Sequence, residues 1–375
     1  MKIVYFHNIL WSRYRLALFD SIAKRIPIDW SFLVCQFARN EISRSSFKDN
    51  ETLPVNHDYR LLSNGNYDDL SFLKRMTLSC LVLFKVNVDV IVVTGYSLPE
   101  SWFSLFFSKL FRKKIILTID SSHLEFDPES KFNFLKRLFV RSVDAVLVYG
   151  YSSTKLVELL GRKEGVFGPF HCVEAGFYLP EFDVIKYRRL HLPSSNFRFL
   201  FVGRLAPEKN ILGLILAFSS VFANRHDVSL QIVGGGELLD ECQLLINRLL
   251  VNNVSLLGPI SGKALTSIYM QTHCFVLPSL IEPWGLVVNE ALCLGTPVVV
   301  SDKCGCVLDL VDNNQDAIKF DALNLADLKR ALLTAYDRFK GLDVERVRRC
   351  IELGQSYSPA TAADIFLRAV GSLKR

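Results

Sequence analysis

The chain alternates short apolar runs rich in β-branched residues with longer segments whose apolar positions recur at helical spacing. This alternation predicts an α/β fold in which parallel sheets are covered by helices on both faces. Helices are expected at 15–24 and 101–111. The expected strands are 2–6, 28–34, 88–93, 114–118 and 145–148 in the first half, and 198–202, 229–233, 254–257, 274–277 and 297–300 in the second.

The strand pattern lapses between about Gly176 and Asn196, where turn-forming residues gather. We therefore predict two doubly wound domains with a boundary near Pro193, covering residues 1–190 and 191–355. The last residues, 356–375, form a separate apolar helical pattern. Ligands of open α/β sheets bind beyond the carboxyl ends of the strands. Two such domains are expected to face a central cleft, so the functional residues should lie at strand-to-loop junctions.

Composition agrees with two buried cores, since half of the 375 residues are hydrophobic and 22% are charged. Lys and Arg number 44 and Asp and Glu 38, a net charge of +6. Residues 1–190 hold 26 basic and 20 acidic side chains and the rest hold 18 of each, so the whole excess lies in the first half. The excess is too thin for a nucleic-acid-binding protein, and favours an anionic membrane surface as the partner.

Cysteine and targeting patterns exclude further classes. The nine cysteines are irregularly spaced and include no C-x-x-C pair, which argues against a disulfide framework. Cys304 and Cys306 lack the second pair that a zinc site needs, so no metal is expected. The opening segment predicts a strand and not a signal peptide, and no long uncharged apolar run exists. We expect a cytoplasmic protein, at most peripheral to a membrane.

The first chemical junction follows the expected strand 198–202. Gly203 permits close approach of a backbone, and Arg204 and Lys209 supply two cations five residues apart, which suit a diphosphate. Two surface cations flanking a helix start would give the same pattern. The second junction contains Gly234, Gly235 and Gly236 after strand 229–233, and favours either an anion site or a tight turn. A full G-x-G-x-x-G fingerprint is absent, because Leu239 stands where the third glycine would fall.

The third junction is the most specific. Pro283 suits a first helical position, so Glu282 is expected on the preceding loop and Glu290 about two turns into a helix that Gly295 ends. Carboxylates accept hydrogen bonds from sugar hydroxyls, and a helix N-terminus attracts anions. The pair therefore indicates a site for a sugar or a nucleotide.

In this order, the three junctions resemble the carboxyl-terminal domain of the GT-B glycosyltransferases, specifically the retaining family 4. The resemblance covers about residues 198–315 and is carried by Gly-Arg-Leu-x-x-x-Lys-Asn at 203–210, the glycines at 234–236, and Glu-x7-Glu at 282–290. It implies sugar transfer from a nucleotide diphosphate, UDP- or GDP-linked, without a metal or other cofactor. The acceptor would be a glycan or a lipid-linked glycan in cell-surface polysaccharide assembly, and residues 1–190 would bind it.

The resemblance also assigns roles. Arg204 and Lys209 would neutralise the diphosphate, Glu282 would hold the donor sugar and Glu290 the ribose. The remaining donor-binding positions would be Gly203, Gly234, Gly236, Trp284, Gly285 and Leu286. In the first half, His123 follows a strand where relatives often place a histidine near the sugar, although an ordinary loop histidine fits equally well. The end of the chain resembles the GT-B helix that crosses back to the first domain.

Two stretches favour a membrane partner, 102–114 and 132–141, because both combine aromatic residues with Lys and Arg. Core-facing helices with solvated cations are the alternative. The glycine-rich turn at 234–236 also leaves a nucleotide-dependent oxidoreductase as a second functional class, and a sugar-nucleotide-binding protein without turnover as a third. The missing third glycine counts against the oxidoreductase. The presence of all four charged site residues, Arg204, Lys209, Glu282 and Glu290, counts against a binding protein without turnover.

Overall fold

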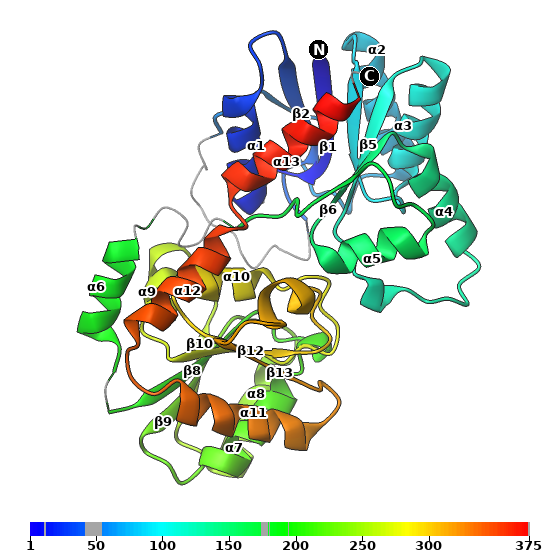
Figure 1. The fold of residues 1–375 in the computed structure, drawn as a ribbon. Helices are drawn as coiled ribbons and strands as arrows, with labels where there is room; N and C mark the ends of the chain where they lie inside the picture. Colours follow the sequence, from blue (N-terminus) through cyan, green and yellow to red (C-terminus); the bar gives the residue numbers. More distant parts are fainter. Residues whose placement is uncertain (11–12, 42–54, 174–178, 180, 194, 374–375) are drawn as a thin grey trace. The chain divides into compact units, whose positions relative to one another are not determined.

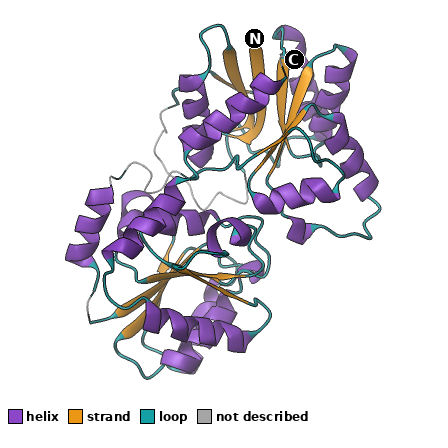
Figure 2. Cartoon of the chain, in the orientation of Figure 1, coloured by secondary structure: helices purple, strands orange, loops and turns teal. Residues whose placement is uncertain are grey.

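The computed structural model describes the chain except for residues 11–12, 42–54, 174–178, 180, 194 and 374–375. It forms two compact α/β units, one made of residues 1–172 with 358–375, the other of residues 173–357. Each unit is a parallel sheet between layers of helices (Figures 1 and 2). The predicted class of two doubly wound α/β domains is confirmed, and so is the return of the C-terminal helix α13 (Pro359–Ser372) to the first unit.

The sheet of the first unit has the order β3-β2-β1-β4-β5-β6-β7, with every pairing parallel. The chain runs outward from β1 in one direction and then returns to β4 on the other side, so β1 and β4 flank the topological switch point. The strands are β1 (Lys2–Ile9), β2 (Ser31–Ala38), β3 (Tyr59–Leu61), β4 (Val90–Thr94), β5 (Lys114–Ile119), β6 (Ala145–Val148) and β7 (Val166–Phe167).

Alternate residues of β1 supply two different cores. Val4 and Phe6 pack toward α2 (Phe72–Lys85), α3 (Pro99–Leu110), α4 (Asn133–Ser142) and α5 (Tyr151–Leu159). Ile3 and Tyr5 pack toward α1 (Arg13–Arg25) and α13 on the other face. The apolar pattern of α13 is thus explained by burial against the first sheet.

The second unit has the order β10-β9-β8-β11-β12-β13, again wholly parallel, with its switch point between β8 and β11. Its strands are β8 (Phe197–Val202), β9 (Val228–Val233), β10 (Val254–Gly258), β11 (Cys274–Leu277), β12 (Val298–Ser301) and β13 (Ala317–Phe320). Its helices are α6 (Glu181–His191), α7 (Ile211–Phe222), α8 (Leu239–Leu249), α9 (Gly262–Met270), α10 (Leu286–Cys293), α11 (Leu325–Arg338) and α12 (Val344–Gln355).

The segment predicted as a linker before Pro193 contains the helix α6, which packs against α9 and α12. Arg188 of α6 is buried, and its guanidinium donates to the carbonyl of Thr272 at 2.9 Å and to the Thr296 hydroxyl at 3.0 Å. These contacts attach α6 to the second unit. The units therefore divide at Cys172 and Val173, ahead of the position that the turn-forming residues suggest.

Candidate functional site

The turn after β8 carries the first pair of predicted cations. Pro207–Lys209 forms a short 3-10 turn, which folds Glu208 back toward Arg204. A nitrogen of the Arg204 guanidinium donates to Glu208 Oε1 at 2.6 Å, and the Arg204 side chain remains half exposed. Arg204 thus has a carboxylate partner of its own and still reaches solvent at the carboxyl end of the central strand.

Lys209 and Glu282 meet across the switch point of the second sheet. Nζ of Lys209 donates to Glu282 Oε2 at 2.5 Å, and the Lys209 and Glu282 side chains are 15% and 14% exposed. The loops that carry them also share backbone contacts, because the Leu280 amide donates to the Glu208 carbonyl at 2.8 Å. β8 and β11 are neighbours only because of the crossover in strand order, so the fold brings together residues that lie 73 positions apart.

The glycines after β9 are explained by close packing of backbones. A Cβ on Gly234 would lie 1.8 Å from the Gly203 carbonyl oxygen, and one on Gly236 would lie 2.5 Å from the Leu205 carbonyl oxygen. Both glycines also have positive φ, at 141° and 155°. The Leu205 amide donates to the Gly235 carbonyl at 2.9 Å. This turn thus supports the loop of Arg204, which is the structural reason for glycine at 234 and 236. A Cβ on Gly203 would lie 3.1 Å from the Phe201 ring.

The loop after β11 differs from the sequence-based expectation at one point. Pro283 does not begin a helix. The helix α10 begins at Leu286, with Gly285 before it at φ 101°, and Glu290 is its fifth residue. Glu290 therefore lies about one turn from the N-terminus and not two. The end of the helix is as predicted, because Gly295 follows α10 with φ 70° and leads into β12.

A second loop holds the backbone of Glu282 and Trp284 in position. Residue 282 bridges to Cys304 in parallel, the Gly305 amide donates to the Glu282 carbonyl at 2.9 Å, and the Cys306 amide donates to the Trp284 carbonyl at 3.0 Å. A Cβ on Gly305 would lie 1.8 Å from the Pro283 carbonyl oxygen. The carbonyls of Glu282 and Trp284 are thus occupied. In the first turn of α10 the Val288 amide donates to the Gly285 carbonyl at 2.9 Å, and the first amides of a helix otherwise lack an intrahelical acceptor.

Glu290 is oriented by a residue that the sequence did not indicate. The Tyr269 hydroxyl, on a completely buried side chain, donates to Glu290 Oε2 at 3.0 Å. Burial, together with the Glu290 charge, raises the pKa of Tyr269 well above its usual value, so the phenol stays protonated and keeps donating. A tyrosine near the end of a helix gives no sequence signal for this role.

Trp284 is buried, which the sequence around it does not predict. Its Nε1 donates to Asn289 Oδ1 at 2.8 Å, and its ring lies 5.6 Å from that of Tyr357. The Trp284 side chain thus anchors the loop. Asn289 and Tyr357 act as structural partners of this loop.

His123 belongs to the first unit, whereas the other predicted site residues belong to the second. It begins a short 3-10 turn capped by Ser122, and its Nδ1 lies 2.7 Å from the Ser152 hydroxyl. Partial burial, and then the positive charge of Lys155, lower the pKa of His123 below the usual histidine value. The imidazole is therefore neutral at neutral pH and able to exchange hydrogen bonds with hydroxyl groups.

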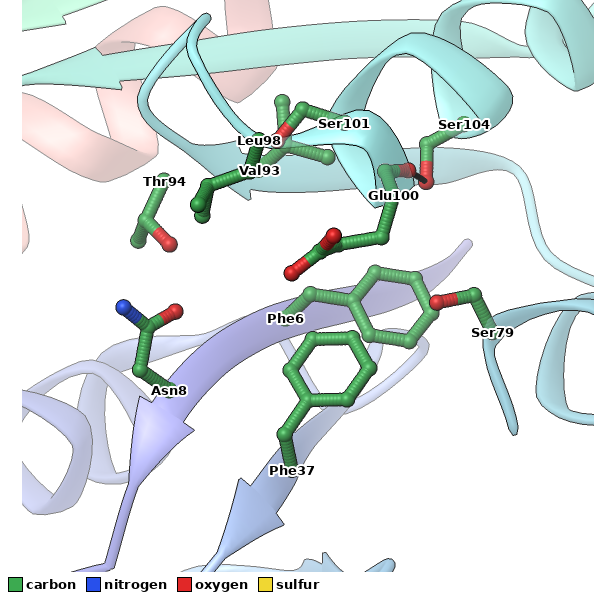
Figure 3. Close-up of a pocket in the computed structure, with 10 residues that line it drawn as sticks. All are labelled: Phe6, Asn8, Phe37, Ser79, Val93, Thr94, Leu98, Glu100, Ser101 and Ser104. Atoms are coloured by element: carbon green, nitrogen blue, oxygen red, sulfur yellow. Dashed lines mark hydrogen bonds between the residues drawn. The ribbon is translucent and has the colours of Figure 1, made fainter. Parts of the chain in front are cut away.

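A small cavity lies at the carboxyl ends of β1 and β4 in the first unit (Figure 3). Glu100, which points into it, is 3% exposed and accepts a hydrogen bond from the Tyr67 hydroxyl at 2.8 Å. Arg75 Nε lies 3.1 Å from the same carboxylate. The cavity has room for about one water molecule. We interpret the contact between Arg75 and Glu100 as an internal ion pair that holds α2 against α3.

The cysteines show no metal-binding arrangement within the part of the chain that the structure describes. Cys304 and Cys306 are buried, and burial raises the pKa of the Cys304 thiol to about 12. Among these described residues, no three His, Cys, Asp or Glu side chains gather as a metal site would require. Within the same residues, no helix is both long and apolar enough to cross a bilayer.

The chain is similar to known glycosyltransferases. Residues 186–352 match the family described as glycosyl transferases group 1. An uncharacterized glycosyltransferase of Methanocaldococcus jannaschii is 35% identical over 147 residues, which is 37% of each chain. The poly(glycerol-phosphate) alpha-glucosyltransferase of Bacillus subtilis is 24% identical over 70% of this chain and 41% of its own length. The chain thus spans less than half the length of either relative.

Among solved structures, the Anabaena protein HepE in complex with UDP covers 99% of this chain, and the chain covers all of HepE, with a TM-score of 0.74 at 18% identity. At that identity the likeness concerns the fold, and it includes both units. The matched residues 186–352 hold every predicted site residue of the second unit. Residues 186–352 of this chain therefore match the glycosyl transferases group 1 family, and the chain has the GT-B fold.

Proposed function

We propose that this protein transfers a sugar from a nucleotide-diphosphate donor to a hydroxyl group of an acceptor, with the donor bound by the second unit. The observation that carries the proposal is the Lys209–Glu282 pair at the β8/β11 switch point, beside the N-terminus of α10. A cation, a carboxylate and the peptide N–H groups of a helix N-terminus are the groups needed to hold a phosphate next to a hydroxylated ring.

In this proposal Arg204 and Lys209 bind the diphosphate. Negative charge grows on the diphosphate as the glycosidic bond breaks, so fixed cations and helix N–H groups stabilise the transition state more than the ground state. Glu282 accepts hydrogen bonds from hydroxyls of the donor sugar, and Glu290, held by Tyr269, accepts from the ribose. Backbone groups of Trp284, Gly285 and Leu286 contact sugar and phosphate.

We propose further that transfer retains the anomeric configuration and needs no metal ion. Arg204, Lys209 and the helix dipole of α10 supply the positive charge that a divalent cation would provide. With retention, the departing phosphate takes the proton of the acceptor hydroxyl on the same face of the sugar. Undiminished transfer in the presence of a chelator, with a product of unchanged anomeric configuration, is expected. A strict Mg²⁺ or Mn²⁺ requirement would contradict it.

We assign acceptor binding to the first unit, with His123 contributing a hydrogen bond near the donor sugar. The neighbours named for UDP support a UDP-linked donor, and a GDP-linked donor fits the same charges. A glycan or lipid-linked glycan of the cell surface is the acceptor class that we propose. The match to a poly(glycerol-phosphate) alpha-glucosyltransferase supports an acceptor of that kind. The protein would then work at the cytoplasmic face of a membrane.

The test begins with thermal unfolding in a panel of UDP- and GDP-sugars, because a ligand that binds the folded state raises the melting temperature. Transfer from the donor that stabilises most is then measured with a hydroxyl acceptor. Stabilisation by a nucleotide sugar that the Lys209→Ala variant loses is expected. Stabilisation by a reduced nicotinamide cofactor instead would favour an oxidoreductase, and binding without transfer to any acceptor would favour a binding protein.

A further inference from the structure

Exposed phenylalanines are concentrated on one side of the first unit. Within the part of the chain that the structure describes, the largely exposed phenylalanines all lie on α2, α3 and α4 or at the ends of these helices. Phe106 is 67% exposed and Phe134 is 71% exposed. The residues of this phenylalanine surface are Phe72, Leu73, Leu81, Phe84, Phe106, Leu110, Phe111, Phe132, Phe134, Leu135 and Leu138.

The three helices form one layer. α2 packs against α3 and α3 packs against α4, all on the same face of the first sheet (Figure 1). The ring of Phe84 on α2 lies 5.2 Å from that of Phe107 and 5.6 Å from that of Phe111, so the outer rings of α2 and α3 are in contact. The phenylalanine surface is therefore a property of one packed layer and not of separate helices. Large exposed apolar patches of this kind mark interaction sites.

The exposed charged residues on the three helices themselves are all positive, whereas Asp68, Asp69, Asp127 and Glu129 are exposed in the segments that precede α2 and α4. α2 and α4 contain no Asp or Glu, and the one acidic residue of α3, Glu100, is buried against Arg75 and Tyr67. The exposed cations on and next to the three helices are Lys74, Lys85, Lys109, Arg112, Lys131, Arg137 and Arg141. The helices themselves therefore favour a partner that is both apolar and anionic.

We propose that the phenylalanine surface docks on a bilayer that contains acidic phospholipids. The rings and leucines enter the interfacial region, and the flanking lysines and arginines pair with lipid phosphates. A second copy of this chain does not fit, because a symmetric dimer through this surface would bring two sets of cations together. The inference is independent of the sugar transfer proposed above, since it rests on surface residues remote in sequence from Lys209 and Glu282.

The test is flotation of the full-length protein with phosphatidylcholine vesicles, with and without about one third phosphatidylglycerol. Binding to the anionic vesicles alone is expected, and it should weaken as NaCl rises from about 0.1 M to about 1 M, where screening is strong. Phe106→Glu with Phe134→Glu is expected to weaken that binding by about tenfold or more. Lys85→Glu with Lys109→Glu should weaken it by a similar factor of about ten or more.

Leu244→Glu is the matched control, because Leu244 of α8 is 68% exposed in the second unit. It should bind vesicles as the unchanged protein does. Melting temperatures close to that of the unchanged protein show that each variant folds. Equal binding to neutral and anionic vesicles, or a Phe106→Glu with Phe134→Glu variant that binds like Leu244→Glu, would overturn the proposal. The proposal would also be overturned if the unchanged protein sedimented as a dimer and bound no vesicles, and if Phe106→Glu with Phe134→Glu converted that dimer to monomers.

Discussion

Lys209 and Glu282 form an ion pair of 2.5 Å between two loops that follow adjacent strands of the second sheet. Both side chains are mostly buried, so solvent screens their charges less than it would on an open surface. In the absence of a donor, each residue is thus the counter-ion of the other. Binding of a nucleotide sugar would divide the pair, with Lys209 turning to phosphate and Glu282 to sugar hydroxyls.

Removal of Lys209 tests the cation assignment. Lys209→Ala should lower the rate of sugar transfer by about 10² to 10³, as loss of one oxyanion-stabilising group does, and Arg204→Ala should act in the same direction. Steady-state kinetics with a saturating acceptor measure both. Transfer at a near-normal rate in either variant, with an unchanged melting temperature, would remove that residue from the diphosphate site.

Removal of the charge of Glu282 separates the two halves of the donor. Glu282→Gln keeps the size of the side chain but leaves Lys209 without its counter-ion. We expect the nucleoside diphosphate alone to bind several-fold tighter and sugar transfer to fall. Calorimetric titration with the nucleotide, next to a transfer assay, checks both. If Glu282→Gln weakened nucleotide binding and lowered sugar transfer together, Glu282 would act only by holding Lys209 in position.

Tyr269 provides a test of the Glu290 assignment. Tyr269→Phe removes one hydrogen bond to a carboxylate and leaves the packing of the ring intact. A hydrogen bond to a charged group contributes about 1.5 to 3 kcal/mol, so KM for the donor should rise by about tenfold or more while kcat changes little. Donor titrations at a fixed acceptor concentration give both constants. An unaltered KM would mean that Glu290 does not need this partner to hold the ribose.

The elements near the site could be predicted because each has a local signal. β11 was expected at 274–277 and lies at Cys274–Leu277, and Gly295 ends α10 as its sequence context indicates. The start of α10 was missed, because Pro283 has the φ of a helix start but its carbonyl packs tightly against Gly305. That constraint comes from a loop 22 residues later and leaves no mark near Pro283.

The partners of the site residues could not be predicted, for a related reason. Lys209 reaches Glu282 only through the strand crossover at β8 and β11, and Tyr269 reaches Glu290 because α9 and α10 precede and follow the same strand, β11. A single sequence gives the residue types at each junction and not the pairs that the sheet brings together. α6 was likewise missed, since its burial depends on contacts of Arg188 with residues about 80 to 110 positions away.

His273 predicts a loss of stability in acid. Burial, and then the charges of Arg188 and Arg198, lower its pKa from 6.5 to about 4, and its Nδ1 accepts a hydrogen bond from the Arg198 amide at 3.1 Å. The unfolded state therefore binds the proton first as pH falls. Stability should be fully present above pH 6.5 and decline between pH 6.5 and about 4.

Denaturant unfolding at several pH values, compared between the unchanged protein and His273→Gln, measures that contribution. Glutamine does not titrate, so the variant should lose less stability over this range, although it is less stable at neutral pH because the stacking on Phe197 is lost. If the free energy of unfolding changed with pH equally in the two proteins, His273 would not be the group responsible for the loss of stability in acid.

Gly305 should be essential for the donor loop, and Gly371 provides a matched glycine with no such role. A Cβ at position 305 would lie 1.8 Å from the Pro283 carbonyl oxygen, whereas one at 371 in α13 meets nothing within 4 Å. Gly305→Ala must therefore move the backbone that carries Glu282 and Trp284, and donor binding should fall at least tenfold, since displacement of positioned groups by about 1 Å costs up to about 10² in rate.

Gly371→Ala should leave donor binding unchanged and raise stability by about 0.5 to 1 kcal/mol, because alanine favours helix. Donor titration and thermal unfolding of both variants separate the outcomes. Normal donor binding by Gly305→Ala would mean that the loop after β12 does not set the geometry of Glu282.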